Sequence, residues 1–265
     1  MGIFEHYQSR YEERKQEEFT IGEFLEICKE DQTAYANAAE RLLQAIGEPE
    51  LIDTANDPAL SRIFSNRVIS RYPAFSEFYG MEEAIEQIVS YLKHAAQGLE
   101  EKKQILYLLG PVGGGKSSLA ERLKELMQHV PIYMLKGSPV NDHPFCLFDV
   151  KEDGDILQKE YGIPKRYLKT IMSPWARKRL HEFNGDITQF KVVRVYPSVL
   201  DQVGIAKTEP GDENNQDISS LVGKVDIRRL EQYAQNDPDA YSYSGSLCKA
   251  NQGLMEFVEM FKAPI

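Results

Sequence analysis

The sequence contains few cysteines and no long apolar run. Cys28, Cys146 and Cys248 are odd in number and far apart, which argues against a disulfide scaffold and is typical of proteins in a reducing compartment. No run of about 18 apolar residues occurs, which disfavours a membrane-spanning helix. Residues 1–18 carry charges where a signal peptide needs an apolar stretch, which disfavours export. We therefore expect a cytoplasmic protein.

Positive charge is also scarce, because 31 Lys and Arg residues stand against 41 Asp and Glu residues and give a formal net charge of −10 at pH 7. Without a long basic tract, binding driven by the charge of nucleic acids or anionic membranes is disfavoured. No internal repeat or low-complexity segment occurs. What the chain has instead is 42% hydrophobic residues over 265 positions. This is enough for the core of one large domain or two modest ones.

The N-terminal residues 3–47 are predicted to be helical throughout. Within them, Thr20 and Glu23 fit the capping-box pattern, which places a helix start directly after Thr20. Gly47 is expected to end the last of these helices, because glycine readily adopts the conformation that closes a helix. No chemistry is evident here, and we interpret residues 1–60 as a helical extension for packing or docking.

The centre of the chain contains apolar segments of two periodicities. Residues 78–98 and 116–130 have apolar side chains at helical spacing, whereas residues 104–109 and 131–135 are short apolar runs typical of buried parallel strands. A strand, a glycine-rich loop, a helix and a second strand in this order predict a βαβ unit in a covered parallel sheet. Residues 138–245 follow no simple pattern, and we expect an inserted segment there.

A phosphate-binding pattern lies between the first of these strands and the helix. Residues 110–117 read GPVGGGKS and fit G-x-x-x-x-G-K-[ST]. The three consecutive glycines have no Cβ, so their N–H groups can approach a polyphosphate at a helix N-terminus. Lys116 is expected to reach the β- and γ-phosphates and to act in catalysis, and the Ser117 hydroxyl is expected to bind Mg²⁺. The residues predicted to bind Mg-ATP are Gly110, Pro111, Val112, Gly113, Gly114, Gly115, Lys116, Ser117 and Ser118.

A second part of the site is expected at the last apolar run. Hydrolysis needs a group that orients water, and Glu259 stands where such a strand would end. Here the sequence resembles the AAA+ ATPases of the branch with magnesium chelatase and the MCM helicases, in which a segment like Ala-Asn-x-Gly precedes a strand ending in Asp-Glu. Residues 250–253 read ANQG, but Val258 replaces the Asp, and Glu256 lies two residues before it. Glu259 is predicted to be catalytic, with a surface Glu as the alternative.

A longer resemblance involves four segments of the chain. Phe78-Tyr79-Gly80, the loop GPVGGGKSS, the stretch VGIAKTEPGD and the segment SGSLCKANQGLMEFVEMFKAPI are together similar to the N-terminal AAA+ region of PrkA. PrkA is a bacterial family of serine protein kinases linked to stress and starvation. The match covers essentially the whole chain, and it implies that Phe78, Tyr79 and Gly80 lie near the adenine of ATP. A packed aromatic turn is the alternative for these three residues.

The resemblance implies an α/β fold in which a P-loop parallel sheet of AAA+ type is flanked by helices. The nucleotide-binding core would span residues 61–265, with an inserted α+β segment at about 138–245. In the AAA+ fold the strand order is 5-1-4-3-2, so a strand after Glu259 would lie between the strand at 104 and the strand at 253. The chain stops at Ile265, and we expect it to be the front part of a longer polypeptide.

Three functions fit these patterns. The first is an ATP-driven AAA+ module that forms nucleotide-dependent homo-oligomers and acts on a protein substrate or regulatory partner. The second is a serine kinase that uses its P loop to transfer the γ-phosphate to a protein, since the V-A-I-K, H-R-D and D-F-G signatures of eukaryotic-type kinases are absent from the sequence. The third is a non-enzymatic, nucleotide-gated binding module, which the replacement at Val258 favours.

Weaker patterns have simpler interpretations. His143 and Cys146 have a ligand-like spacing without a second pair, so packing is favoured over a zinc site. The basic residues 177–179 favour a solvated helix face over contact with nucleic acid. Arg194 could meet a phosphate in a neighbouring subunit, and the acidic loop 209–217 could contact a protein substrate or simply be exposed.

Overall fold

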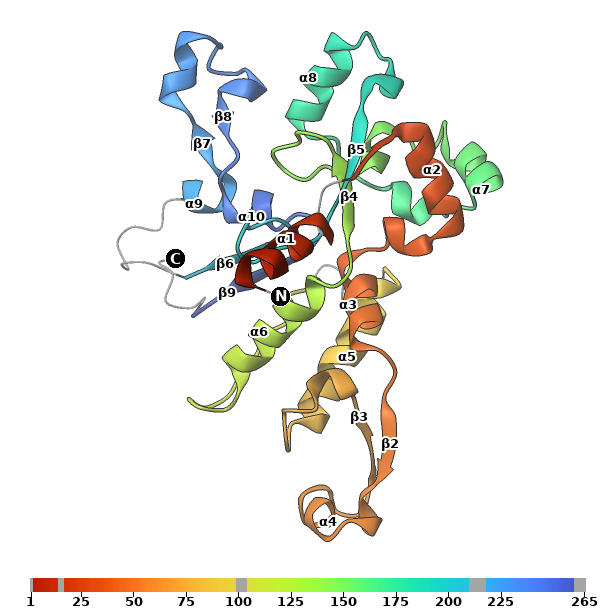
Figure 1. Cartoon of the computed structure of the whole chain (residues 1–265), viewed down its shortest axis with the longest axis vertical. Coiled ribbons are helices and arrows are strands. Elements are labelled where there is room, and N and C mark those ends of the chain that lie inside the picture. The colour runs from red at the N-terminus through yellow and green to blue at the C-terminus, as the bar shows by residue number, and fades with distance from the viewer. Residues whose placement is uncertain (1, 14–16, 99–103, 210–217, 260–265) are drawn as a thin grey trace. The chain divides into compact units, whose positions relative to one another are not determined.

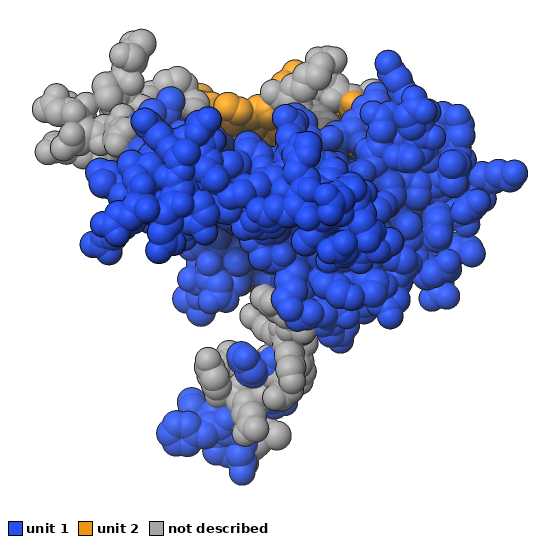
Figure 2. Space-filling view, turned by 90° about the horizontal axis from the view of Figure 1, so that it is seen from above, with its two compact units in different colours: residues 1–35, 131–265 blue, residues 36–130 orange. Residues whose placement is uncertain are grey.

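The structure, a computed structural model, describes residues 2–13, 17–98, 104–209 and 218–259. The chain divides into two compact units, each described by itself: unit 1 comprises residues 1–35 and 131–265, and unit 2 comprises residues 36–130 (Figure 2). Both units mix helices and strands. In the described part of the chain, no helix combines the length and the apolar character needed to cross a membrane.

The elements of each unit are labelled in Figure 1. Unit 1 contains α1 (Ile3–Glu13), β1 (Glu17–Thr20), α2 (Ile21–Glu30), β4 (Ile132–Leu135), α7 (Gly154–Tyr161), α8 (Pro174–Glu182), β5 (Lys191–Val195), β6 (Ile205–Thr208), α9 (Ser219–Val222), β7 (Lys224–Val225), β8 (Tyr241–Ser242), α10 (Ser246–Lys249) and β9 (Leu254–Phe257). Unit 2 contains α3 (Ala38–Ile46), β2 (Glu50–Asp53), α4 (Pro58–Phe64), β3 (Val68–Arg71), α5 (Glu82–Ala96) and α6 (Lys116–Met127).

Helix α2 begins where its capping box predicts. The Glu23 N–H donates to Thr20 Oγ1 over 3.2 Å, and the Thr20 N–H donates to Glu23 Oε2 over 2.7 Å, so two N–H groups at the helix start are satisfied. The prediction of continuous helix before this point is wrong. Residues 17–20 form strand β1, because the antiparallel strand β5 accepts and donates their backbone hydrogen bonds.

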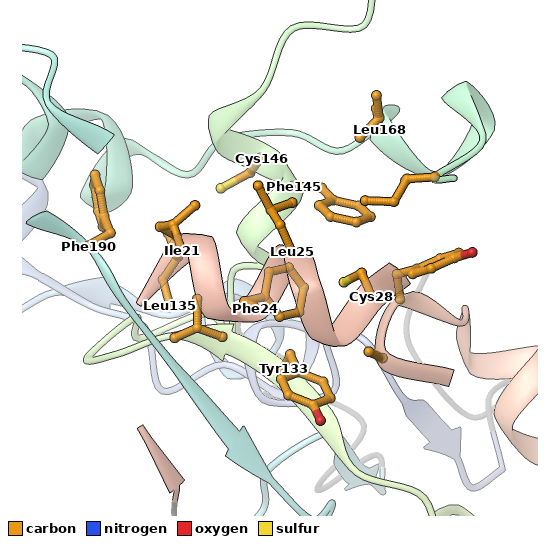
Figure 3. Close-up of a cluster of buried hydrophobic side chains, with 14 of the residues drawn as sticks. Ile21, Phe24, Leu25, Cys28, Tyr133, Leu135, Phe145, Cys146, Leu168 and Phe190 are labelled. Atoms are coloured by element: carbon orange, nitrogen blue, oxygen red, sulfur yellow. The ribbon is translucent and has the colours of Figure 1, made fainter. Parts of the chain in front are cut away.

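Strands β1, β5 and β4 form an antiparallel sheet in that order, with one apolar layer on each face. Helix α2 covers one face, and Figure 3 shows Phe24 and Leu25 of this helix among side chains from β4 and from the turn at 144–147. The Phe24 ring centre lies 5.3 Å from that of Tyr133 and 5.7 Å from that of Phe145. On the other face, a smaller cluster consists of Ile132, Met134, Val193 and Val195 with Val203.

The predicted parallel partner for residues 131–135 is wrong. Strand β4 forms there, but its hydrogen-bond partner is β5, which runs antiparallel to it. Within the described residues, parallel pairing is confined to β6 and β9, which align Ile205 with Leu254 and Thr208 with Phe257. The two strands come very close at their start, because a Cβ on Gly253 would lie 1.7 Å from the carbonyl oxygen of Gly204.

Unit 2 is built around the helices α3, α5 and α6, which pack on one another through buried aliphatic side chains. Asn37 and Glu40 form a capping box at the start of α3, and Gly47 ends this helix with a φ of 75°, as predicted. The Asn37 side chain also donates to the carbonyl of Ala96 at the end of α5 over 3.2 Å. Strands β2 and β3 form an antiparallel hairpin whose connection carries α4.

The strand predicted at residues 104–109 is absent. Residues 105–110 have no assigned secondary structure, and in the described part of the chain no strand pairs with them. Ile105 and Leu109 are 73% and 83% exposed. A β-strand needs a neighbour for its backbone hydrogen bonds, so an apolar run without such a neighbour stays extended and irregular.

Candidate nucleotide-binding site

The phosphate-loop pattern forms an exposed turn between the extended residues 105–110 and helix α6. The Gly114 N–H donates to the carbonyl of Pro111 over 3.2 Å and closes the turn. Gly113 and Gly115 have φ values of 79° and 75°, in the left-handed region that other residues rarely adopt. A Cβ on Gly114 would lie 3.1 Å from the Pro111 oxygen. The backbone conformation therefore favours glycine at positions 113 and 115, and a side chain at position 114 would crowd the Pro111 carbonyl.

Helix α6 presents its N-terminus directly behind this turn. It begins at Lys116, Gly115 is its N-cap, and its first turn contains no acidic residue. The N–H groups and the dipole of such a helix start favour an anion. Leu119 and Leu123 are buried, and Arg122 Nε donates to the carbonyl of Ala74 over 2.7 Å, so the helix is fixed within unit 2.

The Lys116 side chain bends back over its own loop. Its Nζ donates to the carbonyl oxygens of Gly110 at 2.7 Å and Pro111 at 2.6 Å. Phosphate oxygens carry negative charge, so an ammonium group binds them more strongly than it binds neutral carbonyl oxygens. Ser117, the next residue, is exposed in the first turn of α6. The residues therefore fit a polyphosphate with its Mg²⁺ ion.

Residues 78–80, which are predicted to lie near adenine, are followed by Met81, and this residue contacts the glycine-rich turn. A Cβ on Gly115 would lie 2.9 Å from Met81 Sδ, so Met81 packs directly against the turn at 110–115, which we call the phosphate turn. The Phe78 ring lies edge-on to Phe75, with ring centres 6.0 Å apart, and Tyr79 is 80% exposed. The structure brings this segment to the phosphate turn, and the contact of Phe78, Tyr79 and Gly80 with adenine stays a prediction.

Glu259 belongs to unit 1, at the end of the parallel β6–β9 pair. Strand β9 ends at Phe257, but the Val258 N–H still donates to the carbonyl of Thr208 over 2.9 Å. Glu259 follows as an exposed residue with a φ of 51°. Glu256 lies within the strand, opposite Lys207. Glu259 therefore follows the end of a parallel strand, and its catalytic role stays a prediction.

The ANQG segment before β9 is held by a set of hydrogen bonds that the sequence did not reveal. Asn251 Nδ2 donates to the carbonyl of Val140 over 2.7 Å. Gln252 Nε2 donates to the carbonyls of Asn141 at 2.7 Å and Tyr133 at 3.0 Å. Asn141 in turn donates to the carbonyl of Lys249 over 3.1 Å. The loop after β4 thus fixes the start of β9 within unit 1.

The weaker candidates have structural partners. His143 Nδ1 accepts a hydrogen bond from the Phe145 N–H over 3.1 Å, and burial raises the pKa of the neighbouring Cys146 thiol to about 12. Among the described residues, no three His, Cys, Asp or Glu side chains gather as metal ligands. Arg194 pairs with Glu17 over 3.0 Å. These contacts indicate packing roles in unit 1.

The basic residues of α8 pair with acidic residues. Lys178 contacts Asp237 at 2.7 Å and Asp239 at 2.6 Å, and Arg179 contacts Asp239 at 3.0 Å. This pairing neutralises much of the positive charge on the helix. Most of the acidic loop 209–217 lies outside the described residues.

Comparison with known proteins identifies the family. A model of the PrkA AAA domain matches residues 19–265. The chain belongs to this family. The resemblance to PrkA predicted from the sequence is thereby confirmed. No solved structure matches the chain.

Two curated relatives illustrate the range of the family. The chain is 78% identical over 269 residues to a protein of Escherichia coli (strain K12) named serine/threonine kinase YeaG, a match that covers 100% of the chain and 42% of the relative. It is 34% identical over 260 residues to a protein of Bacillus subtilis (strain 168) named ATP-dependent protease PrkA, which covers 95% of the chain and 39% of that relative. The chain therefore spans about two fifths of the length of these enzymes.

Proposed function

We propose that the chain is an ATP-binding AAA module of a PrkA-type protein, which binds Mg-ATP through residues 110–118 and hydrolyses it. The observation that carries this proposal is the phosphate turn. Gly113 and Gly115 hold left-handed conformations, and Lys116 reaches back over the turn at the N-terminus of α6. A turn that served only to reverse the chain would not need these glycines combined with a lysine at a helix start.

Each side chain has a defined part in this proposal. Lys116 exchanges its two carbonyl acceptors for β- and γ-phosphate oxygens, which fixes the γ-phosphate against the turn. The Ser117 hydroxyl would hold Mg²⁺, and the ion would supply positive charge that stabilises the charge developing on the phosphates. Glu259 orients the attacking water and accepts its proton.

The proposed architecture follows the AAA+ pattern. Residues 1–60 would be a helical extension, and residues 61–265 a nucleotide-binding core with an inserted α+β segment at about 138–245. The parallel β6–β9 pair would be part of a larger P-loop sheet flanked by helices. Nucleotide-dependent homo-oligomers, a protein substrate or regulatory partner, a cytoplasmic location and a role in the stress response remain proposals.

A second candidate is transfer of the γ-phosphate to a protein serine. It is favoured by the Escherichia coli relative named serine/threonine kinase YeaG, which is 78% identical to the chain. Val258 favours a third candidate, a nucleotide-gated module without catalysis, because it provides no carboxylate beside Glu259.

The test is an assay of the purified chain with Mg²⁺ and γ-labelled ATP that follows free phosphate and labelled protein together. We expect phosphate release that falls at least a hundredfold in Lys116→Ala and in Glu259→Gln. Matched controls are Lys93→Ala, an exposed lysine of α5, and Glu231→Gln, an exposed glutamate of unit 1, and both should retain wild-type rates.

The outcomes separate the three candidates. Label that appears on a serine and disappears in Lys116→Ala would replace hydrolysis by the kinase function. Tight ATP binding with neither product would favour the gated module. An unchanged rate in Lys116→Ala would contradict the proposed site altogether.

A further inference from the structure

Glu82 is a buried acidic residue whose Oε2 atom has no hydrogen-bond partner in the described part of the chain. It is the first residue of α5 and is 8% exposed. Its Oε2 atom is fully buried, and among the described residues no hydrogen bond or ion pair to Glu82 is present. A buried polar group without a hydrogen-bond partner loses the hydration of the unfolded state, and the helix dipole at the start of α5 offsets only part of that loss. Such a group calls for a donor from outside the chain.

The space beside Glu82 is small and largely aromatic. A cavity of about 10 Å³ is lined by Ser70, Arg71, Tyr72, Phe75, Phe78, Glu82 and Ile85. That volume admits about one water-sized group. Tyr72 and Phe75 are buried, and the partly exposed Phe78 ring offers a flat apolar surface, which suits a planar base better than a sugar or a phosphate. A ligand would therefore insert only one small donor group here.

The cavity lies in the same unit as the phosphate turn and next to a segment that contacts it. Met81 directly precedes Glu82 and packs against Gly115. Phe78, which lines the cavity, is part of the segment expected near adenine. The carboxylate is thus one residue away from the contact between this segment and the loop.

We propose that Glu82 accepts a hydrogen bond from the exocyclic amino group of adenine and so makes the site select ATP over GTP. This inference rests on the proposed function, because it assumes that a nucleotide binds at the phosphate turn. An amino group is water-sized and donates to a carboxylate. Guanine carries a carbonyl oxygen at the equivalent position, which would face the carboxylate acceptor to acceptor.

The expected selectivity follows from the strength of such a bond. A hydrogen bond to a charged group corresponds to about a tenfold to hundredfold change in affinity. Glutamine at position 82 can turn its amide to accept from adenine or to donate to the guanine oxygen. Glu82→Gln should therefore bind GTP about tenfold more tightly than wild type and lose most of the preference for ATP.

The experiment is displacement of a fluorescent ATP analogue from the purified chain by ATP, GTP, 2′-deoxy-ATP and inorganic tripolyphosphate. The proteins are wild type, Glu82→Gln, Glu82→Leu and a matched control, Glu83→Gln. Glu83 is the next residue of the same helix, exposed and paired with Arg67. We expect the ratio of ATP to GTP affinity to collapse in both Glu82 variants and to stay unchanged in the control. Tripolyphosphate affinity should be equal in all four proteins.

A thermal melt without nucleotide gives an independent test. Replacing an unpartnered buried carboxylate by an amide removes a desolvation cost, so Glu82→Gln should melt at a temperature equal to or above that of wild type. A melting temperature lowered by more than the loss of the Glu82 interaction with the α5 helix dipole would show that the folded chain already compensates this carboxylate, and it would overturn the proposal.

The remaining outcomes are also decisive. If Glu82→Gln keeps the wild-type preference for ATP over GTP and still binds tripolyphosphate, the phosphate turn is intact and the proposal is overturned. A change confined to 2′-deoxy-ATP assigns Glu82 to the ribose and overturns the assignment to the base. Failure of wild type to bind ATP or tripolyphosphate removes the proposed function, and this inference with it.

Discussion

At Gly115 the phosphate turn has no space for a side chain. The residue combines a φ of 75° with a contact in which a Cβ would lie 2.9 Å from Met81 Sδ. The left-handed conformation alone costs a residue with a Cβ about 1–2 kcal/mol. The contact adds to this cost unless Met81 moves away. A single methyl group at this position therefore affects both the turn and the segment beside it.

We predict that Gly115→Ala lowers the free energy of unfolding by about 1–2 kcal/mol, because alanine is strained at this φ, and that it weakens ATP binding. Urea unfolding and nucleotide titration measure the two effects. The control is Gly22→Ala in helix α2, where no atom lies within 4 Å of an added Cβ, and alanine should stabilise it by about 0.5–1 kcal/mol. Equal stability of Gly115→Ala and wild type would contradict the conclusion that the turn needs glycine at this position.

At the scale of elements, short sequence patterns correctly predicted the helix starts and ends that hydrogen bonds between nearby residues determine. The capping box at Thr20, the end of α3 at Gly47 and the helix from Lys116 all follow from contacts within a few residues. The apolar run at 104–109 failed as a strand because a strand depends on partners far away in the sequence. The same non-local dependence made the pairing of β4 unpredictable, since β5 lies more than 50 residues downstream.

The candidate site shows the same division. The phosphate turn was predictable because its chemistry lies in consecutive residues. Glu82 and the hydrogen bonds of Asn251 and Gln252 were not, because their significance depends on burial and on carbonyl groups more than 100 residues away. No pattern of residue types in the sequence marks a carboxylate that lacks a partner.

Helix α8 is held to the turn at 237–240 by an ion pair that responds to acid. The Lys178 ammonium group donates to Asp237 and lowers the pKa of that carboxyl group, while the same contact raises the pKa of Lys178. A lowered carboxyl pKa gives a stability contribution that is present above the pKa of the unfolded state, near 4, and is lost as the pH falls below it.

We therefore predict that Lys178→Met destabilises the protein at pH 7 and that the difference from wild type shrinks as the pH falls below about 4. Chemical unfolding across this pH range measures the difference. Lys159→Met, at an exposed position of α7, is the control and should show no such pH dependence. A difference that stays constant down to pH 3 would show that packing of the lysine stem, rather than its charge, joins α8 to the turn.

At the scale of the whole molecule, unit 1 has a core assembled from distant parts of the chain. Cys28 on α2 and Cys146 after β4 lie in the same buried cluster, as Figure 3 shows. Burial raises the pKa of both thiols, that of Cys146 to about 12. Cys248 is half-buried, outside this cluster. The native protein therefore keeps two of its three thiols from reacting.

We predict that a thiol reagent at pH 8 labels Cys248 first and labels Cys28 and Cys146 later, at one common rate. Burial keeps both thiols protonated at that pH, and both sites become accessible only when the shared core opens. Mass spectrometry of a labelling time course measures the three rates. Much faster labelling of Cys28 than of Cys146 would contradict a single cooperative core.

The close approach of β6 and β9 has a consequence for the natural variation of the protein. A Cβ on Gly253 would overlap the carbonyl oxygen of Gly204, although Gly253 is itself only half-buried. Every other amino acid carries a Cβ, so no missense change at Gly253 can be accommodated without separating the two strands. In a saturation-mutagenesis survey, this partly exposed codon should accept silent changes alone.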